Sequence, residues 1–183
     1  MLTLFALLTL TPAHADQPPA PTFTLDQVIE RMTAELKDVC DFDEDSVKDR
    51  KGNSTVYAFK AKDYDNIRDY QLFEMPCTRG AYNFGSAYYL ADAYGTLQHV
   101  SFAEPAFGPK DEVIGWETSK LLINSGFEPK DLTVSFFSKG RGLGDCFSSG
   151  TYKFVDGRFL LKRYDYDGKC DGKINPKKIV NLK

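Results

Sequence analysis

Apolar residues recur at helical spacing in one stretch near the start of the chain. The positions that would share one helix face are Leu25, Val28, Ile29, Met32 and Leu36. Thr24 precedes this stretch and Gln27 lies in its first turn, which is the pattern of a capping box. The spacing therefore predicts one amphipathic N-terminal helix that ends near Lys37.

Beyond that helix, short runs rich in β-branched and aromatic residues alternate with turn residues. These runs predict strands at residues 55–61, 70–75, 87–93, 96–102, 117–123, 132–137, 152–155 and 158–164. Asp156-Gly157, between the last two runs, is a strong hairpin signal. We therefore expect a mainly β (α+β) fold, an antiparallel β-sheet domain with one N-terminal amphipathic helix. No repeat or long linker divides the chain, so residues 23–183 are expected to form a single domain.

The first residues have the pattern of a signal peptide. Residues 2–10 form an apolar run that is too short to span a membrane, and Ala13-His14-Ala15 offers the small residues that a signal peptidase accepts. No Lys or Arg precedes the run, and a buried N-terminal strand or helix is the alternative. We expect a signal peptide at residues 1–15, a flexible Pro-rich leader at 16–22, and a mature protein in the periplasm or secreted.

Composition and charge limit the function classes. The 183 residues are 42% hydrophobic and 27% charged, which suits a folded domain with a core of its own. No later apolar run approaches the roughly 18 residues of a membrane-spanning helix, so stable membrane insertion is not expected. The net charge of -3 argues against a dedicated nucleic-acid binder. The C-terminal segment is locally basic, and its lysines either keep an edge strand soluble or contact an anionic envelope surface.

The cysteines indicate how the fold is held together. The four are Cys40, Cys77, Cys146 and Cys170. An even number in an oxidising compartment predicts two disulfides, for which three connectivities exist. We expect a Cys146–Cys170 bridge, because these residues flank a predicted hairpin, and a Cys40–Cys77 bridge by elimination. No CxxC pair occurs, so neither zinc nor another metal is expected, and no cofactor is indicated.

The most unusual segment is SKGRGLGDCFSSG at residues 138–150. Its alternating glycines allow backbone amides to turn toward an anion, with Arg141 as a forked donor. Arg141 and Asp145 are therefore candidate binding residues. The alternative is a tight glycine turn that carries Cys146 into its disulfide, with Arg141 paired to a nearby carboxylate.

A second segment, MPCTRGAYNF at residues 75–84, adds the candidate binding residues Arg79, Tyr82 and Asn83. They flank a Gly-Ala pair just after Cys77. The alternative is a strand end that anchors a disulfide, with the tyrosine ring packed and its hydroxyl bonded to the backbone.

No catalytic group is identified by the sequence. His99 lies within a predicted strand, and no GxSxG elbow occurs. Two carboxyls can serve as acid and base, with Glu104, Glu117 and Asp145 as candidates, but nothing in the sequence selects a pair. The acidic segment at residues 165–171 invites a calcium site, yet lysine, cysteine and proline fall where an EF-hand needs its ligands.

Taken together, the Cys-x-x-Gly-Ala-Tyr-Asn motif at 77–83 and the Lys-Gly-Arg-Gly-Leu-Gly-Asp-Cys motif at 139–146 resemble an exported bacterial family. An aromatic strand at 152–154, an apolar strand at 159–161 and a final Cys170 complete the pattern. The family is known as domain of unknown function 1176, and the likeness to its C-terminal half covers roughly residues 35–172. Typical members look about twice as long, with six cysteines. The resemblance implies export and disulfides but no activity.

The residues and the resemblance together favour an uncharacterised exported protein, a non-catalytic binding or inhibitor module of the cell envelope. Its partner would be an envelope protein or polymer, and an inhibitor of cell-wall hydrolases is one concrete version. The alternative is an envelope hydrolase acting on a glycan or phosphoester, with Arg141 as anion clamp and Asp145 or His99 as acid or base. A purely structural assembly partner is a third possibility.

Overall fold

The N-terminal helix forms as the sequence predicts. The computed structural model describes residues 22–40 and 50–182, so the expected signal peptide and nearly all of the leader lie outside the described residues. Helix α1 spans Leu25–Leu36. The Thr24 N–H donates to Gln27 Oε1 at 2.8 Å and the Gln27 N–H donates to Thr24 Oγ1 at 3.3 Å, which confirms the capping box.

Antiparallel strands make up most of the remaining chain, in three sheets. The first sheet contains β1 (Thr55–Asp63), β2 (Asn66–Arg79), β3 (Phe84–Ala91) and β4 (Leu97–His99) in that order, with β7 (Leu122–Ile123) also paired to β3. The second has the order β12 (Lys177–Asn181), β11 (Arg158–Asp167), β10 (Phe147–Val155), β9 (Thr133–Lys139) and β8 (Gly126–Glu128). The third is the hairpin of β5 (Phe102–Phe107) and β6 (Val113–Ser119).

Several predicted strands have different limits in the structure. The run at 96–102 is divided between β4 and β5, because the Val100 N–H still donates to Tyr88 of β3 whereas Phe102 already pairs with β6. The run at 117–123 is likewise divided between β6 and β7. Strands β8 and β12 were not predicted, since one is three residues long and the other contains adjacent lysines. The fold class is nonetheless the predicted one.

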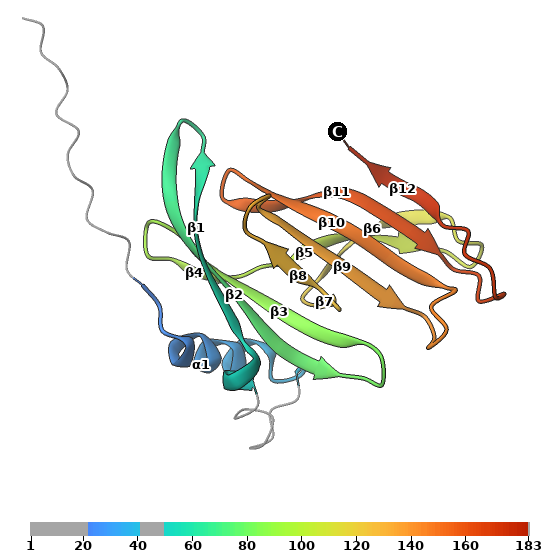
Figure 1. Cartoon of the computed structure of the whole chain (residues 1–183), viewed down its shortest axis with the longest axis horizontal. Helices are drawn as coiled ribbons and strands as arrows, with labels where there is room; N and C mark the ends of the chain where they lie inside the picture. Colours follow the sequence, from blue (N-terminus) through green and yellow to red (C-terminus); the bar gives the residue numbers. More distant parts are fainter. Residues whose placement is uncertain (1–21, 41–49, 183) are drawn as a thin grey trace, which may run out of the picture.

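Two layers of apolar contact hold the fold together. Strand β3 of the first sheet is buried on both faces, since its consecutive residues Tyr88 and Tyr89 are fully buried but belong to different clusters. Tyr88 packs between the first and second sheets, whereas Tyr89 packs against α1. Figure 1 shows α1 beneath β2 and β3, on the side away from the second sheet.

Both predicted disulfides are present. Cys40 is bonded to Cys77, which fixes the end of α1 to β2, and Cys146 is bonded to Cys170 across the β10–β11 hairpin. Two structural disulfides are typical of proteins that work outside the reducing cytoplasm, and they place this protein in that class. Among the described helices, none is long and apolar enough to cross a membrane.

Candidate functional site

The glycine-rich segment forms a tight loop between β9 and β10. The Gly140 N–H donates to the Cys146 carbonyl at 2.8 Å, and the Gly144 N–H donates to the Arg141 carbonyl at 2.9 Å. Gly144 has a φ of +69°, a conformation that favours glycine. A Cβ atom at Gly140 would lie 2.9 Å from the Cys146 sulfur. The glycines are therefore needed to close the loop against the disulfide.

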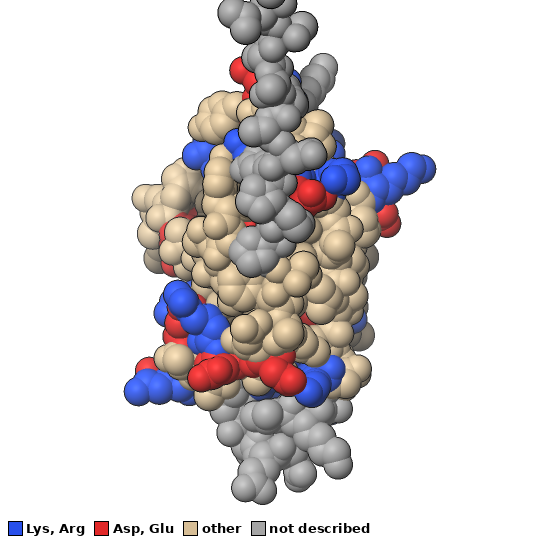
Figure 2. Space-filling view, turned by 90° about the vertical axis from the view of Figure 1, so that its left-hand side faces the viewer, with Lys and Arg blue, Asp and Glu red and all other residues tan. Residues whose placement is uncertain are grey.

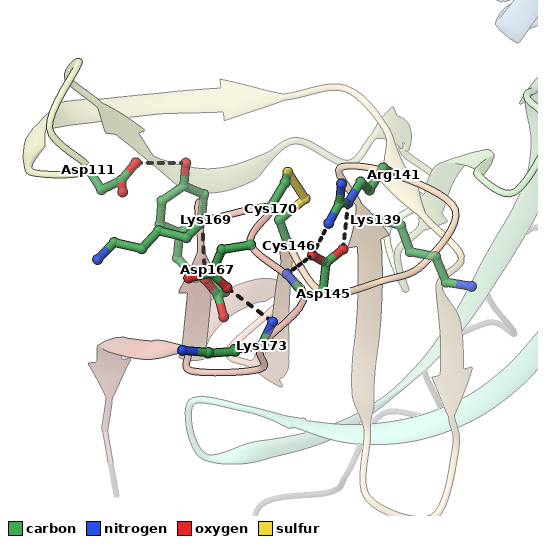
Figure 3. Close-up of a disulfide and its surroundings, with 12 residues drawn as sticks. Asp111, Lys139, Arg141, Asp145, Cys146, Asp167, Lys169, Cys170 and Lys173 are labelled. Carbon is green, nitrogen blue, oxygen red and sulfur yellow. Dashed lines mark hydrogen bonds and ion pairs between the residues drawn. A yellow bond between two sulfur atoms is a disulfide. The ribbon is translucent and has the colours of Figure 1, made fainter.

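An ion pair closes the same loop from inside. The Arg141 guanidinium binds both carboxylate oxygens of Asp145, with Nε 2.7 Å from Oδ1. The Gly172 N–H donates to Asp145 Oδ2 at 2.7 Å, so this one carboxylate also holds the segment that follows Cys170. Asp145 is only 5% exposed. Figure 3 shows Asp145 between Arg141 and the backbone beyond Cys170.

This geometry determines the charge states of the pair. The Arg141 guanidinium, helped by the Gly172 amide, holds the pKa of Asp145 well below its usual range, and the hydrogen bond to Asp145 raises the pKa of Arg141. The Arg141 guanidinium, predicted to bind an anionic ligand, binds Asp145 of the same loop instead. Of the two sequence interpretations, the structure favours the glycine turn with an internal Arg–carboxylate pair.

The second sequence motif lies against this loop. Asn83 pairs with the backbone of Lys139, donating from Nδ2 to its carbonyl at 2.9 Å and accepting from its N–H at 3.2 Å. The Tyr82 ring lies beside Gly142, where an added Cβ would be 3.8 Å from Cδ1. The structure therefore brings Tyr82, Asn83, Arg141 and Asp145 together. Arg79 lies at the end of β2, with its guanidinium carbon 6.0 Å from the centre of the Phe84 ring.

Asn124 joins the two motifs and was not among the predicted residues. Its Nδ2 donates to the carbonyls of Phe137 and Tyr82 at 3.0 and 3.1 Å, and its Oδ1 accepts from the Phe84 N–H at 3.0 Å. Its φ of 44° is in the left-handed region, which asparagine tolerates better than most residues. Asn-Ser-Gly is typical of a turn, but the sequence does not show the long-range contacts of Asn124.

At the tip of the loop, Leu143 points into solvent. It is 80% exposed, more than any other large apolar side chain of the described residues, and the neighbouring ring of Tyr82 is also exposed. Lys139, at the start of this loop, extends away from the disulfide (Figure 3). The loop therefore holds a leucine outward on a backbone fixed by a disulfide, an ion pair and the Asn83 contacts. We call residues 139–146 the presenting loop.

The carboxylates of the suspected calcium segment have partners within the protein. Asp165 accepts from the Arg163 guanidinium, and Asp167 accepts from the backbone N–H groups of Lys169 and Asn175 at 3.2 and 2.6 Å. Asp171 accepts from the Lys173 N–H at 3.0 Å. These bonds shape the segment between β11 and β12.

His99 contacts a backbone carbonyl and an aromatic ring within the protein. Its Nε2 lies 3.0 Å from the Lys120 carbonyl oxygen, and its ring packs edge-on against Tyr89. Burial lowers the pKa of His99, which favours the neutral ring. It lies on β4, in a different sheet from the presenting loop.

A pair of carboxyls does come together on the third sheet. Glu104 of β5 lies directly opposite Glu117 of β6. Burial, with the nearby Glu117 charge, raises the pKa of Glu104 to about 7. Like charges directly opposite each other on a sheet are destabilising. The sequence named these two residues without pairing them, because only the strand register shows that they face one another.

This pair gives a pH-dependent prediction. The pKa of Glu104 is about 7 in the folded protein and near the ordinary 4.5 when unfolded, so charging this half-buried group costs stability as the pH rises between those values. Glu104→Gln is therefore expected to raise the free energy of unfolding by about 2 kcal/mol at pH 8, a value reduced for partial solvation, and by little at pH 4. Urea denaturation at both pH values measures this difference.

The control is Glu30→Gln on the exposed face of α1, which should leave the stability unchanged at both pH values. An equal gain in the free energy of unfolding for Glu104→Gln at pH 4 and pH 8 would contradict a raised pKa of Glu104 in the folded protein.

Comparison with known proteins now adds the family. The family model described as "Protein of unknown function (DUF1176)" matches residues 8–179, which is most of the chain. The chain belongs to this family. The match confirms the resemblance seen in the two motifs, and it begins further toward the N-terminus than the expected residue 35. No solved structure matches this chain.

One curated relative of this DUF1176 chain is the "Uncharacterized protein YpfG" of Escherichia coli (strain K12), which is 38% identical over 63 residues. The aligned part is 34% of this chain and 18% of that protein. Neither the family description nor the relative's name states an activity, so the function has to be argued from the geometry of the chain itself.

Proposed function

We propose that this DUF1176 protein is a non-catalytic binding module of the bacterial cell envelope, located in the periplasm or secreted, and that the presenting loop is its binding element. The observation that carries the proposal is Leu143, which is 80% exposed on a loop fixed from several sides. A rigid loop with an exposed apolar side chain binds a concave surface without a large ordering cost. The expected partner is an envelope protein, and a cell-wall hydrolase with an open cleft is the concrete version.

The placement of charged side chains supports recognition through a few residues of the presenting loop, and not attraction by a large patch of one sign of charge. Figure 2 shows the side of the molecule with α1 and the β1–β2 end, opposite to the presenting loop, and on that side Lys and Arg side chains lie beside Asp and Glu side chains, above and below a largely uncharged middle. At the presenting loop, Arg141 and Asp145 neutralise each other. Recognition at this loop therefore rests on Leu143 and the neighbouring Tyr82 ring, with Lys139 at the rim.

The first test is inhibition of cell-wall hydrolases. Purified protein is titrated into a panel of lysozymes, and we expect the activity of at least one enzyme to fall. Leu143→Asp should weaken that inhibition by roughly ten- to a hundredfold, since burying a leucine contributes about 1.5–3 kcal/mol. Ile67→Asp is the matched control, because Ile67 is 68% exposed at the β1–β2 end of the molecule, away from the presenting loop.

Two results would count against this version. If no enzyme of the panel loses activity, the inhibitor proposal is wrong. If Leu143→Asp and Ile67→Asp inhibit as well as the natural chain, the inhibiting surface lies elsewhere and the presenting loop is not the binding element.

The alternative is an envelope hydrolase acting on a glycan or a phosphoester. The observation that favours it is the Glu104–Glu117 pair, since a carboxyl with a pKa of about 7 beside another carboxyl suits general acid–base catalysis. Arg141 would not serve it as an anion clamp, because its guanidinium is bound to Asp145. Turnover of peptidoglycan fragments or p-nitrophenyl phosphate that disappears in Glu104→Gln would favour this alternative over the binding module.

A further inference from the structure

The exposed edge strands of this protein differ in how they are protected against pairing with another chain. Strand β1 carries Lys60 and Lys62, and β12 carries Lys177 and Lys178, as the basic C-terminal segment led us to expect. Strands β4 and β8 are three residues long, and β5 contains Pro105. Lysines, prolines and short lengths are the usual devices that keep an edge strand from pairing.

Strand β6 has none of these devices. Its seven residues, VIGWETS, contain no Lys, Arg or Pro. It pairs with β5 along one edge, and across residues 22–40 and 50–182 no strand pairs with its other edge. Ile114 and Trp116 are 67% and 59% exposed. An unprotected edge with large exposed apolar side chains is the kind of strand that adds a partner strand.

The sequence of β6 is complementary to itself. Trp116 is the middle residue of Val113–Ser119. A second copy of β6, aligned antiparallel along its whole length, would therefore place Trp116 opposite the Trp116 of the other copy. Glu117, the one charged residue of the strand, would then face Gly115, and Ile114 would face Thr118. Aromatic cross-strand pairs are favourable, and no like charges lie directly opposite each other in this register, in which the two Glu117 side chains are diagonal neighbours.

We propose that β6 is a homodimer interface, in which two copies of this chain pair through their β6 edges around a two-fold axis at Trp116. Closed two-fold symmetry uses the same patch on both copies and leaves no further open edge. The second sheet, which contains β9 and the presenting loop, is not used in this pairing. The proposal stands on β6 alone and does not depend on the proposed binding role.

The test uses the full mature chain, with its only tryptophan as the probe. Sedimentation should show a monomer–dimer equilibrium, and the Trp116 emission should shift to shorter wavelength as the protein concentration rises. Thr118→Lys keeps the probe but places a lysine on the exposed edge, and it should remain monomeric with unshifted emission. Ile67→Lys places a lysine at another exposed position, away from β6, and should dimerise like the natural chain.

The proposal would be overturned if the chain remained monomeric at every concentration up to about 1 mM, the level of a very weak complex. The β6 edge would then be available to an extended segment of another protein. Dimerisation that persists in Thr118→Lys, or that leaves the Trp116 emission unchanged, would also overturn it, because the interface would then lie on another surface.

Discussion

Replacing both Cys146 and Cys170 with serine is expected to lower the free energy of unfolding by about 3 kcal/mol, because the disulfide no longer restricts the unfolded chain between them. The same change should also loosen the presenting loop. The two cysteines are separated by 24 positions. The Gly140 and Gly144 amides are hydrogen-bonded within the presenting loop, to the carbonyls of Cys146 and Arg141. Their exchange with solvent deuterium should therefore become faster in the variant, and this exchange is the measurement.

The other disulfide supplies a matched control. Cys40 and Cys77 are separated by 37 positions, so replacing both with serine should cost a similar amount of about 3 kcal/mol. That bond holds α1 to β2, and its loss should leave the Gly140 and Gly144 amides protected. Equal exchange of these amides in both variants would contradict the claim that the Cys146–Cys170 bond specifically fixes the presenting loop.

Phe102→Ala is expected to lower the free energy of unfolding by about 4 kcal/mol, within the range for a buried phenylalanine that leaves a cavity. Phe102 is fully buried, and its ring centre lies 4.8 Å from that of Tyr152 and 5.5 Å from that of Tyr88. It therefore connects the β5–β6 hairpin to both larger sheets. Chemical denaturation followed by far-UV circular dichroism measures the loss.

Ile67→Ala is the comparison for this core substitution, because Ile67 is 68% exposed and should change stability by less than about 0.5 kcal/mol. A decrease of less than about 1.5 kcal/mol in the free energy of unfolding of Phe102→Ala is typical of a side chain whose removal leaves little cavity. Such a result would contradict a core shared by the β5–β6 hairpin and the two larger sheets. The β5–β6 hairpin would then be held to the sheets by other contacts.

Local pattern was enough to predict the helix, most strands and both disulfides. The capping box at Thr24 and Gln27 and the Asp156-Gly157 turn act over a few residues, so the sequence shows them directly. The division of residues 96–102 between two sheets was not visible, because it depends on which partner Val100 finds in β3. Strand β12 was missed because its pairing with β11 outweighs the low β-propensity of its lysines.

The sequence singled out candidate binding residues but not their arrangement in space. Unusual glycine spacing singled out Arg141 and Asp145, yet only the structure shows that they bind each other. Asn124 was missed because its partners Phe84 and Phe137 lie 40 and 13 positions away. Leu143 was missed because one leucine among glycines carries no signal until its exposure is known.

The proposed function requires the presenting loop to contact a partner in the cell envelope. The most direct test places a photo-crosslinking amino acid at position 143 or at position 67 of the full chain in living cells, followed by irradiation. Both positions are exposed, and Figure 1 shows the loop that follows β9 and the β1–β2 end far apart. We predict a discrete crosslinked product from position 143 that is absent from position 67 and is lost in the Cys146→Ser, Cys170→Ser variant. No product from position 143, or the same products from both positions, would contradict the claim.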